Sequence, residues 1–580
     1  MDNASGAFSP KPRAILCGLA ISLAGLVYLN ALHNPFVYDD HRTIVDNPSV
    51  RGVLNLWTVV FFHVFRPVVN VSYALDYAVW GSGPFGYHLT SLLLHAANVG
   101  LLFHLTRQAV EDARIHGGPA RVSRRDPVGV AFTAAALIAV HPLMTEAVAY
   151  ASGRAEVLCG TFFLLALVTM RKALHTNQVR WYALSLGFWA LALGSKEVAI
   201  MFPVVVLLYD RWLLGGSTEA RRRRLRRLHA PLLGFLVLVG AARLVVFLWI
   251  ETQPPPVPPW QYALMELEVI WRYLFLLIVP LSQSIVHTVR VVTTPFDASA
   301  LLAGAGLGVL MLLVVRLRHR EPLVAFGVAW FLFLLAPSSS LIPLNEAMAE
   351  HRVYLASCGF FMAVAAALSG VFARLSARGV RLGISPRTGL ALVLAALSVL
   401  TVARNRVWAD PVTLWRDATR KAPDTWLPHY ALGDALRTRG ACAEAIPAYQ
   451  TARRLRPQEP LVYANLGACL IEVRQFAAAD EVLSSALRID PRSVRAHNNR
   501  GVLALLTGNP DEARRHFLEA LAHDPRHVSA RQNLAALYET TFASPADALR
   551  LCQEIQRIAP HTTGVEECIR RNQGRLGLVQ

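Results

Sequence analysis

The amino-acid sequence predicts an all-α protein in which a polytopic membrane domain of about 11 transmembrane helices is followed by a helical-repeat α-solenoid. Of its 580 residues, 54% are hydrophobic and only 17% are charged, a combination that soluble domains rarely show. Apolar runs fill residues 13–403 and almost stop at Arg404. We therefore predict a membrane domain at 1–403, a linker at 404–426 and a repeat domain at 427–580.

The topology of the membrane domain follows from its loops. A helix needs about 20 apolar residues to cross a bilayer, and basic loops stay on the inner face. Strict alternation places the basic loops inside through segment 230–250 and then fails, unless 263–281 is an interfacial or re-entrant helix, as its amphipathic start indicates. About eleven crossings then remain, with the N-terminus inside and the C-terminus outside. The twelve apolar segments lie near 13–32, 88–106, 128–147, 155–170, 181–194, 197–213, 230–250, 263–281, 299–316, 322–336, 353–373 and 388–403.

Charge and cysteine usage exclude some classes of protein. Arginines in short inner loops, such as the cluster at 221–227, account for much of the net charge of +18. No basic patch is interleaved with base-stacking aromatic residues, which argues against nucleic-acid binding. None of the seven cysteines form a CxxC pair, so a zinc site is not expected. Cys552 and Cys568 could pair if the tail is extracytoplasmic.

The scarcity of lysine relative to arginine is typical of a GC-rich genome and favours a bacterial source. We therefore expect an integral protein of a bacterial inner membrane, with its repeats in the periplasm. In a eukaryotic cell the equivalent would be the endoplasmic reticulum membrane, with the repeats in the lumen.

The C-terminal third repeats with a period of 34 residues. Small residues recur at fixed offsets, where they allow two helices to approach closely, and a proline ends each second helix. This pattern resembles the tetratricopeptide repeat, whose solenoid can hold an extended peptide or simply scaffold and dimerise. About four repeats are expected, at 427–460, 461–494, 495–528 and 529–563. The periodic positions are Pro423, Pro457, Pro491 and Pro525, then Gly433, Gly467, Gly501 and Ala535, and then Ala445, Ala479 and Ala513.

Two adjacent acids, Asp39 and Asp40, follow the first apolar span directly. A carboxylate at the outer membrane boundary is well placed to act as general base for a hydroxyl acceptor. The alternative is an acidic turn in a solvated loop. Two adjacent acids are too few ligands to indicate a divalent metal.

Other ionisable residues lie at the same predicted face. The stretch from His141 to Glu146 closes the third span, and Arg154 follows shortly after. Ionisable groups at this depth are functional or paired, and a mutual Glu146–Arg154 ion pair is the alternative to a site. Lys196 and Glu197 form a hairpin between two apolar segments, where the ammonium group could bind phosphate as a point charge.

The final polar group precedes the span at 353. Arg352 could hold a phosphate through a bidentate contact or could pair with Glu350 to hold the loop. His287 follows the interfacial helix and is either part of the site or a plain loop histidine. A carboxylate base, two or three cations and an apolar wall would fit the acceptor, phosphate and lipid tail of a lipid-linked sugar reaction.

The order of these motifs resembles that of the transmembrane and tetratricopeptide-repeat O-mannosyltransferases and their bacterial relatives, over nearly the whole chain. The quoted motifs are Phe36-Val-Tyr-Asp-Asp40, Arg66-Pro67, His141-Pro-Leu-Met-Thr-Glu-Ala-Val148, Gly153-Arg154-Ala, Lys196-Glu197 and Glu350-His351-Arg352-Val-Tyr354. The resemblance implies a GT-C glycosyltransferase fold. His351 separates the Glu and Arg that the family carries side by side.

By this resemblance, Asp39 is the catalytic base, with Asp40 beside it. The reaction would be an inverting transfer of a monosaccharide, mannose by resemblance, from a polyprenyl phosphate to a hydroxyl group, such as that of a protein Ser or Thr. Arg154, Lys196 and Arg352 would bind the donor phosphate, with leaving-group charge stabilised by the two arginines. The expected partners are membrane lipid, the lipid-linked sugar and an acceptor protein held by the repeats. Supporting roles fall to His141, Glu146, Glu197, His287 and Glu350.

Three other interpretations remain open. The first is a ligase of preassembled lipid-linked glycans, which a monosaccharide donor would distinguish. The second is a non-catalytic, membrane-anchored repeat scaffold. The third is a transporter, although matching halves with broken helices are not evident in the sequence.

Overall fold

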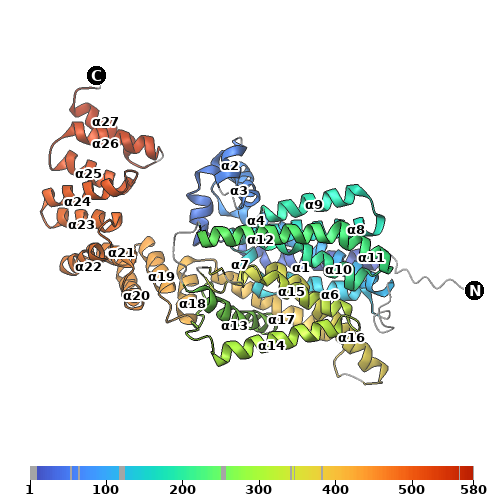
Figure 1. Cartoon of the computed structure of the whole chain (residues 1–580). Coiled ribbons are helices and arrows are strands. Elements are labelled where there is room, and N and C mark those ends of the chain that lie inside the picture. Colours follow the sequence, from blue (N-terminus) through green and yellow to red (C-terminus); the bar gives the residue numbers. More distant parts are fainter. Residues whose placement is uncertain are drawn as a thin grey trace, which may run out of the picture. The chain divides into compact units, whose positions relative to one another are not determined.

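The computed structural model describes residues 10–52, 55–62, 66–115, 125–249, 257–339, 342–344, 346–380, 383–560 and 562–578. In this part of the chain the regular structure is helical, which confirms the all-α prediction (Figure 1). The chain divides into two compact units, Met1–Asp410 and Pro411–Gln580. The stretch 404–426, expected as a linker, contains the end of one helix and the whole of another, so little of it is irregular.

The first unit is a bundle of apolar helices joined by short 3₁₀ and π turns. Its helices are α1 (Pro10–Tyr28), α2 (Leu56–Phe62), α3 (Pro67–Trp80), α4 (Pro84–Ile115), α6 (Pro127–Val140), α7 (Thr145–Val148), α8 (Arg154–Thr176), α9 (Val179–Leu193), α10 (Phe202–Tyr209), α11 (Thr218–Arg224), α12 (Ala230–Trp249), α13 (Pro259–Ile278), α14 (Ala298–Leu317), α15 (Pro322–Leu335), α16 (Tyr354–Ala377) and α17 (Pro386–Val407).

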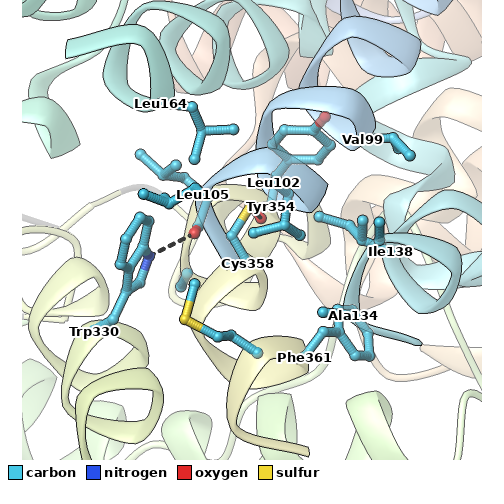
Figure 2. Packing of buried hydrophobic residues seen from close by; sticks show 14 of the residues in the cluster. Val99, Leu102, Leu105, Ala134, Ile138, Leu164, Trp330, Tyr354, Cys358 and Phe361 are labelled. Atoms are coloured by element: carbon cyan, nitrogen blue, oxygen red, sulfur yellow. Dashed lines mark hydrogen bonds between the residues drawn. The ribbon is translucent and has the colours of Figure 1, made fainter. Parts of the chain in front are cut away.

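The centre of this unit is the close packing of α15 against α16. A Cβ atom on Gly327 would overlap the carbonyl oxygen of Gly359, so glycine is required for the two backbones to approach. The Trp330 indole then reaches across and donates a hydrogen bond to the Leu355 carbonyl at 2.9 Å (Figure 2). Side chains of α4, α6 and α8 complete the buried cluster around these two helices.

Within the described residues, seven helices are long and apolar enough to cross a membrane. An eighth span is obtained if the pair 127–140 and 142–148, bent by 56°, counts as one. The protein is therefore an integral membrane protein, and the expected number of about eleven crossings is higher than this count of long helices, which leaves out the shorter apolar helices. The segments 181–194 and 322–336 form helices of only 15 and 14 residues.

Two further expected spans differ from simple crossings. Segment 197–213 is divided into the 3₁₀ turn Glu197–Met201, α10 and the π turn Asp210–Leu214. Segment 263–281 corresponds to the amphipathic helix α13, which is not among the membrane-spanning candidates. This result agrees with its separation from the full crossings on sequence grounds.

The break in the bent span has a clear local cause. Pro142 lacks a backbone donor and cannot continue the helix of α6. His141 stops the helix in an extended conformation, and its Nδ1 accepts a hydrogen bond from the Leu143 N–H at 3.3 Å. The chain resumes as α7, which carries Glu146 at its first turn. The His-Pro pair thus redirects the helix so that Glu146 reaches the polar cluster described below.

The second unit is a stack of antiparallel helix pairs. Its helices are α18 (Pro411–Lys421), α19 (Trp426–Thr438), α20 (Cys442–Leu455), α21 (Pro460–Glu472), α22 (Phe476–Ile489), α23 (Val494–Leu506), α24 (Pro510–His523), α25 (Val528–Thr540), α26 (Pro545–Ile558) and α27 (Val565–Arg575). The four pairs from α19 to α26 coincide with the four predicted repeats.

The periodic small residues have the predicted role. A Cβ atom added to Gly433, Gly467 or Gly501 would lie 2.5–2.8 Å from a buried side chain of the partner helix, namely Tyr449, Leu483 or Phe517. The alanines at the second set of offsets, among them Ala445, Ala479 and Ala513, are fully buried. Close helix pairing within each repeat therefore depends on these positions.

Two disulfides link helices of the repeat unit. The bond between Cys552 and Cys568 joins α26 to α27, and its Cα atoms are 6.3 Å apart. A second bond, which the sequence did not suggest, joins Cys442 of α20 to Cys469 of α21. Disulfides persist in oxidising compartments and are rare in the cytosol.

We expect Gly501→Ala to destabilise the repeat unit by about 1–3 kcal/mol, because the new methyl group overlaps the buried Phe517 ring. Urea unfolding of the detergent-solubilised full chain, followed by protease sensitivity of the repeats, would measure the change. Gly574→Ala is the matched control, since its Cβ would contact nothing within 4 Å. Equal unfolding midpoints for the two variants would contradict the packing argument.

Candidate active site

The first loop after α1 is anchored by Asp40. This residue is completely buried. Its carboxylate accepts hydrogen bonds from the Val37 N–H at 3.1 Å, the Ser152 N–H at 2.7 Å and the Ser152 hydroxyl at 2.6 Å. Burial raises the pKa of Asp40 to about 7, although these hydrogen bonds act in the opposite direction. Asp40 therefore ties the loop to the turn that precedes α8.

Asp39 lies in the opposite environment from its neighbour. Its side chain is exposed and forms no ion pair within 4 Å among the described residues. Its backbone is held at both ends, because its N–H donates to the Tyr150 hydroxyl at 3.0 Å and its carbonyl accepts from the Thr43 hydroxyl at 2.8 Å. Asp39 is thus an accessible carboxylate on a fixed backbone.

Burial and the neighbouring charges shift the pKa of the Asp39 carboxylate. Partial desolvation by the surrounding protein raises the pKa of Asp39, while the guanidinium groups of Arg42 and Arg66 and the Tyr150 hydroxyl lower it, with a net upward shift. The preceding residue, Tyr38, has a φ of 51°, a conformation that non-glycine residues rarely adopt. Such backbone strain concentrates at functional sites.

The loop before α16 lies against this first loop. The Tyr38 hydroxyl donates to Glu346 Oε1 at 3.2 Å. Burial raises the pKa of Glu346, and the negative charges of Glu146 and Asp39 add to this shift, whereas the positive charge of Arg352 opposes it. Residues from both loops therefore share one electrostatic environment.

Arg352 differs from most buried or half-buried cations of the bundle. It donates one hydrogen bond, from Nη1 to the Ala347 carbonyl at 3.3 Å, and has no carboxylate within 4 Å in the described part of the chain. Burial raises the pKa of Glu266 to about 7 and also raises the pKa of Tyr273. The positive charge of Arg352 opposes both shifts. Its guanidinium group retains donors for an anion.

Glu350 does not pair with Arg352. It accepts hydrogen bonds from the Ser284 N–H at 2.7 Å and from His287 Nε2 at 2.9 Å, and both of these partners lie in the loop after α13. The side chains of Glu350 and His287 are only 2% and 1% exposed. The alternative in which Arg352 pairs with Glu350 to hold the loop is therefore wrong, and His287 is a buried partner of Glu350 rather than a plain loop residue.

Glu146 likewise hydrogen-bonds to the loop before α16 and not to Arg154. Its two oxygens contact His351, at 2.7 Å from Nδ1 and 3.2 Å from the backbone N–H. The Glu146–Arg154 ion pair that the sequence suggested does not form, because Arg154 has other partners. The inserted His351 thus connects the end of the bent span to the loop that carries Arg352.

Arg154 is fully buried and saturated by protein groups. It forms an ion pair with Asp76 at 2.5 Å and donates to the Tyr87 carbonyl at 2.6 Å. Its guanidinium carbon also lies 4.8 Å from the centre of the Tyr73 ring. A donor phosphate could reach this group only by displacing these contacts, so the geometry assigns Arg154 to holding α3, α4 and α8 together.

The Lys196–Glu197 hairpin divides into a buried and an exposed residue. Lys196 forms a buried ion pair with Glu156 of α8. Glu197 is exposed and lies 3.6 Å from Arg66. His141, at the break of the bent span, hydrogen-bonds to the Leu277 carbonyl at 3.2 Å. Lys196 and His141 therefore bind other groups of the protein, as Arg154 does.

Sequence reasoning missed several groups that shape this site. Ser152 and Tyr150 fix Asp40 and Asp39, and Glu346 bonds the phenol of Tyr38. Ser and Tyr carry no charge signal, which explains why sequence patterns did not reveal them.

The structure explains two sequence motifs, Arg66-Pro67 and Gly153-Arg154, whose roles the sequence did not show. Arg66 of the Arg-Pro motif acts on the carboxylate of Asp39 and lies beside Glu197. A Cβ on Gly153 would overlap the Glu146 carbonyl oxygen, so the Gly-Arg motif marks a close approach of two backbones.

No group of three or more His, Cys, Asp or Glu side chains in the described ranges is arranged to hold a metal ion. The fold and the polar cluster define an integral membrane protein that carries an accessible carboxylate, nearby cations and a tetratricopeptide-repeat domain.

Comparison with known proteins refines this class. A family model described as dolichyl-phosphate-mannose-protein mannosyltransferase matches residues 126–249, and tetratricopeptide-repeat models match 402–460 and 494–527. The chain is 25% identical to protein O-mannosyl-transferase F38B6.6 of Caenorhabditis elegans, covering 77% of this chain and 64% of that protein. It is 27% identical to protein O-mannosyl-transferase TMTC1 of Homo sapiens, covering 76% and 55%.

These matches confirm the resemblance to the tetratricopeptide-repeat O-mannosyltransferases, although the chain spans less than two thirds of the length of these two curated relatives. Among solved structures, a thermophilic tetratricopeptide-repeat protein of Thermus thermophilus is 22% identical with a TM-score of 0.26, covering 34% of this chain and 100% of that one.

We expect Arg154→Met to destabilise the membrane unit by about 3–5 kcal/mol, because Asp76 is left as an uncompensated buried charge. The double variant Asp76→Asn/Arg154→Met should recover much of this loss. Thermal unfolding of both variants in detergent measures the difference. If Arg154→Met instead left the unfolding temperature unchanged and reduced only donor binding, the assignment of Arg154 to the fold would be wrong.

Proposed function

We propose that this protein transfers a monosaccharide, mannose by resemblance, from a polyprenyl-phosphate donor to a hydroxyl group of an acceptor protein, with inversion at the anomeric carbon. The observation that carries the proposal is the contrast between the two adjacent acids. Asp40 is buried and fully hydrogen-bonded, whereas Asp39 is exposed beside two arginines. Of the two, Asp39 is the one available to accept a proton from a substrate.

In the proposed reaction, Asp39 removes the proton of the acceptor hydroxyl while the oxygen of that hydroxyl attacks the anomeric carbon. The bond between that carbon and the phosphate oxygen breaks, and the electron pair leaves with the polyprenyl phosphate. A carboxylate whose pKa is raised above its ordinary value is a stronger base, which suits this step. The covalent bond made and the bond broken lie on opposite faces of the sugar carbon, so configuration inverts.

Arg352 is the proposed donor-phosphate ligand. It lies at the start of a membrane span, where the phosphate of a lipid donor must sit because its tail occupies the hydrocarbon. Its bonding to a carbonyl instead of a carboxylate leaves donors for the phosphate oxygens. Arg154 and Lys196, which already hold Asp76 and Glu156, are not assigned to the phosphate.

In this proposal the acceptor is a protein, because the relatives are named protein O-mannosyl-transferases. The tetratricopeptide repeats would provide the surface that binds it. A non-catalytic repeat scaffold is the second candidate. Nothing in that role requires an exposed, electrostatically tuned Asp39, so loss of sugar transfer on changing this one side chain distinguishes the two.

We expect Asp39→Asn to lower transfer by about 10²–10⁴-fold without lowering thermal stability, because it removes only the proton acceptor. Mass spectrometry of hexose on extracytoplasmic proteins, in cells that carry the wild type, the variant or no copy of this gene, measures transfer. Asp40→Ala is the comparison: it should lower the unfolding temperature, since Val37 and Ser152 lose their acceptor. Full hexose modification with Asp39→Asn would reject the assignment.

Arg352→Lys keeps the charge but loses the planar pair of donors. We expect it to weaken binding of a polyprenyl-phosphate donor more than binding of acceptor, measured as separate KM values on purified protein. Arg42→Lys is the matched control, because Arg42 acts on Asp39 rather than on the donor in this scheme. Reduced stability with unaltered donor affinity would mean that Arg352 only holds the Ala347 carbonyl.

The repeats are proposed to lie outside the cytoplasm, on the same side as Asp39. The inner-loop charge pattern and the two disulfides support this orientation. A reporter that is active only in the cytoplasm should therefore stay silent when fused after Gln580, whereas the same reporter placed in the arginine-rich segment 221–227 should be active. Activity at the C-terminus would overturn both the orientation and the location of the site.

A further inference from the structure

A cavity lined largely by polar residues lies between α4, α8 and α9, away from the site described above. Its volume is about 440 Å³. The polar residues that line it are His104 and Gln108 of α4, Thr169, Arg171 and Lys172 of α8, and Trp181 of α9. None of these residues has a role in the proposed transfer reaction.

The cavity and the proposed active site are at opposite ends of the same two helices. Near the active site, Ser91 of α4 contacts Arg154 of α8. Gln108 and Arg171 follow these residues by 17 positions each. At 1.5 Å per residue, 17 positions correspond to about 26 Å, close to the thickness of the hydrocarbon core of a bilayer. The cavity therefore opens at the other membrane face.

Two groups that line the cavity have donors with no protein partner among the described residues, namely the exposed ammonium group of Lys172 and the buried indole N–H of Trp181. Lys172 Nζ lies 3.7 Å from the centre of the Trp181 ring and has no carboxylate within 4 Å in the part of the chain that the structure describes. Trp181 Nε1 is buried and has no hydrogen-bond partner among the described residues. Arg171 uses Nε and Nη2 to bind Asp112, both at 2.7 Å, and also interacts with the Tyr209 hydroxyl, so its charge is already paired within the protein. The Lys172 ammonium group and the unpaired Trp181 N–H lie in the same cavity, and both would bind an anion.

Gln108 adds an unused acceptor to these donors. Its Nε2 donates to His104 at 2.8 Å, whereas its Oε1 is buried and has no partner within the described ranges. An inorganic phosphate alone would satisfy the donors, but a ligand that also carries a hydroxyl group would satisfy Gln108 as well. The apolar Val168 lines the same cavity, where a hydrocarbon chain could continue.

We propose that this cavity binds the phosphate headgroup of an anionic glycerophospholipid from the leaflet opposite to the active site. Lys172 and Trp181 hold the phosphate, and Gln108 Oε1 accepts a hydrogen bond from a headgroup hydroxyl. Basic cavities between transmembrane helices on the inner face are suited to such headgroups. The use of lysine here, in a chain that otherwise relies on arginine, fits a compact charge seated against an indole ring.

Native mass spectrometry of the full-length protein in detergent, titrated with phosphatidylglycerol or phosphatidylcholine, tests the proposal. The wild type should retain phosphatidylglycerol in preference to phosphatidylcholine. Lys172→Gln should weaken that binding by about tenfold or more, the loss expected for one charge-assisted contact. Arg223→Gln removes the same charge from an exposed position on α11 and should leave binding unchanged. Equal affinity in the wild type and Lys172→Gln would overturn the site.

Two further measurements separate the ligand from its alternatives. Trp181→Phe keeps the aromatic ring under Lys172 but removes the N–H, so it should weaken phosphatidylglycerol binding while the unfolding temperature stays that of the wild type. Inorganic phosphate, added in excess, should compete weakly with the lipid. If phosphate displaces the lipid completely at equal concentration, or if phosphatidylcholine binds as well as phosphatidylglycerol, the lipid assignment is rejected.

Discussion

The buried carboxylate of Asp40 is the constraint on which the geometry of the outer polar cluster depends. Three protein hydrogen bonds hold it between the first loop and the turn before α8. The turn can occupy this position only because Gly153 approaches the Glu146 carbonyl closely. The position of Glu146 in turn depends on the change of chain direction at Pro142. One connected set of local requirements thus positions the backbone of Asp39, which stays exposed.

A second principle of the bundle is that buried charges are paired inside it. Arg154 pairs with Asp76, Lys196 with Glu156 and Arg171 with Asp112. An ion removed from water costs several kcal/mol unless a partner compensates it, so each pair locks the helices that contribute to it. Because Arg352 has no carboxylate partner among the described residues of these helices, an anionic ligand is the natural complement to its charge.

The repeat unit is stabilised by different means. Each glycine at the 34-residue period allows one large side chain of the partner helix to fill the space between two helices. Asparagines at the same period connect neighbouring repeats: Asn499 donates to the Ala464 carbonyl at 2.9 Å, and Asn533 donates to Asn498 at 2.9 Å. Two disulfides add covalent links between helices. A rigid solenoid of this kind can present a constant surface to an extended peptide.

The sequence alone determined the class of both units, because helix formation and membrane insertion depend on local composition and the repeats on a periodic pattern. It also marked Asp39, Arg352 and Glu350 through their motifs. Only the tertiary structure decided their roles. Whether a buried charge serves the fold or a ligand depends on which opposite charge lies within a few ångströms, and those partners are distant in the chain: Asp76 for Arg154, Glu156 for Lys196 and His287 for Glu350. Such pairings follow from helix packing, which no local sequence pattern encodes.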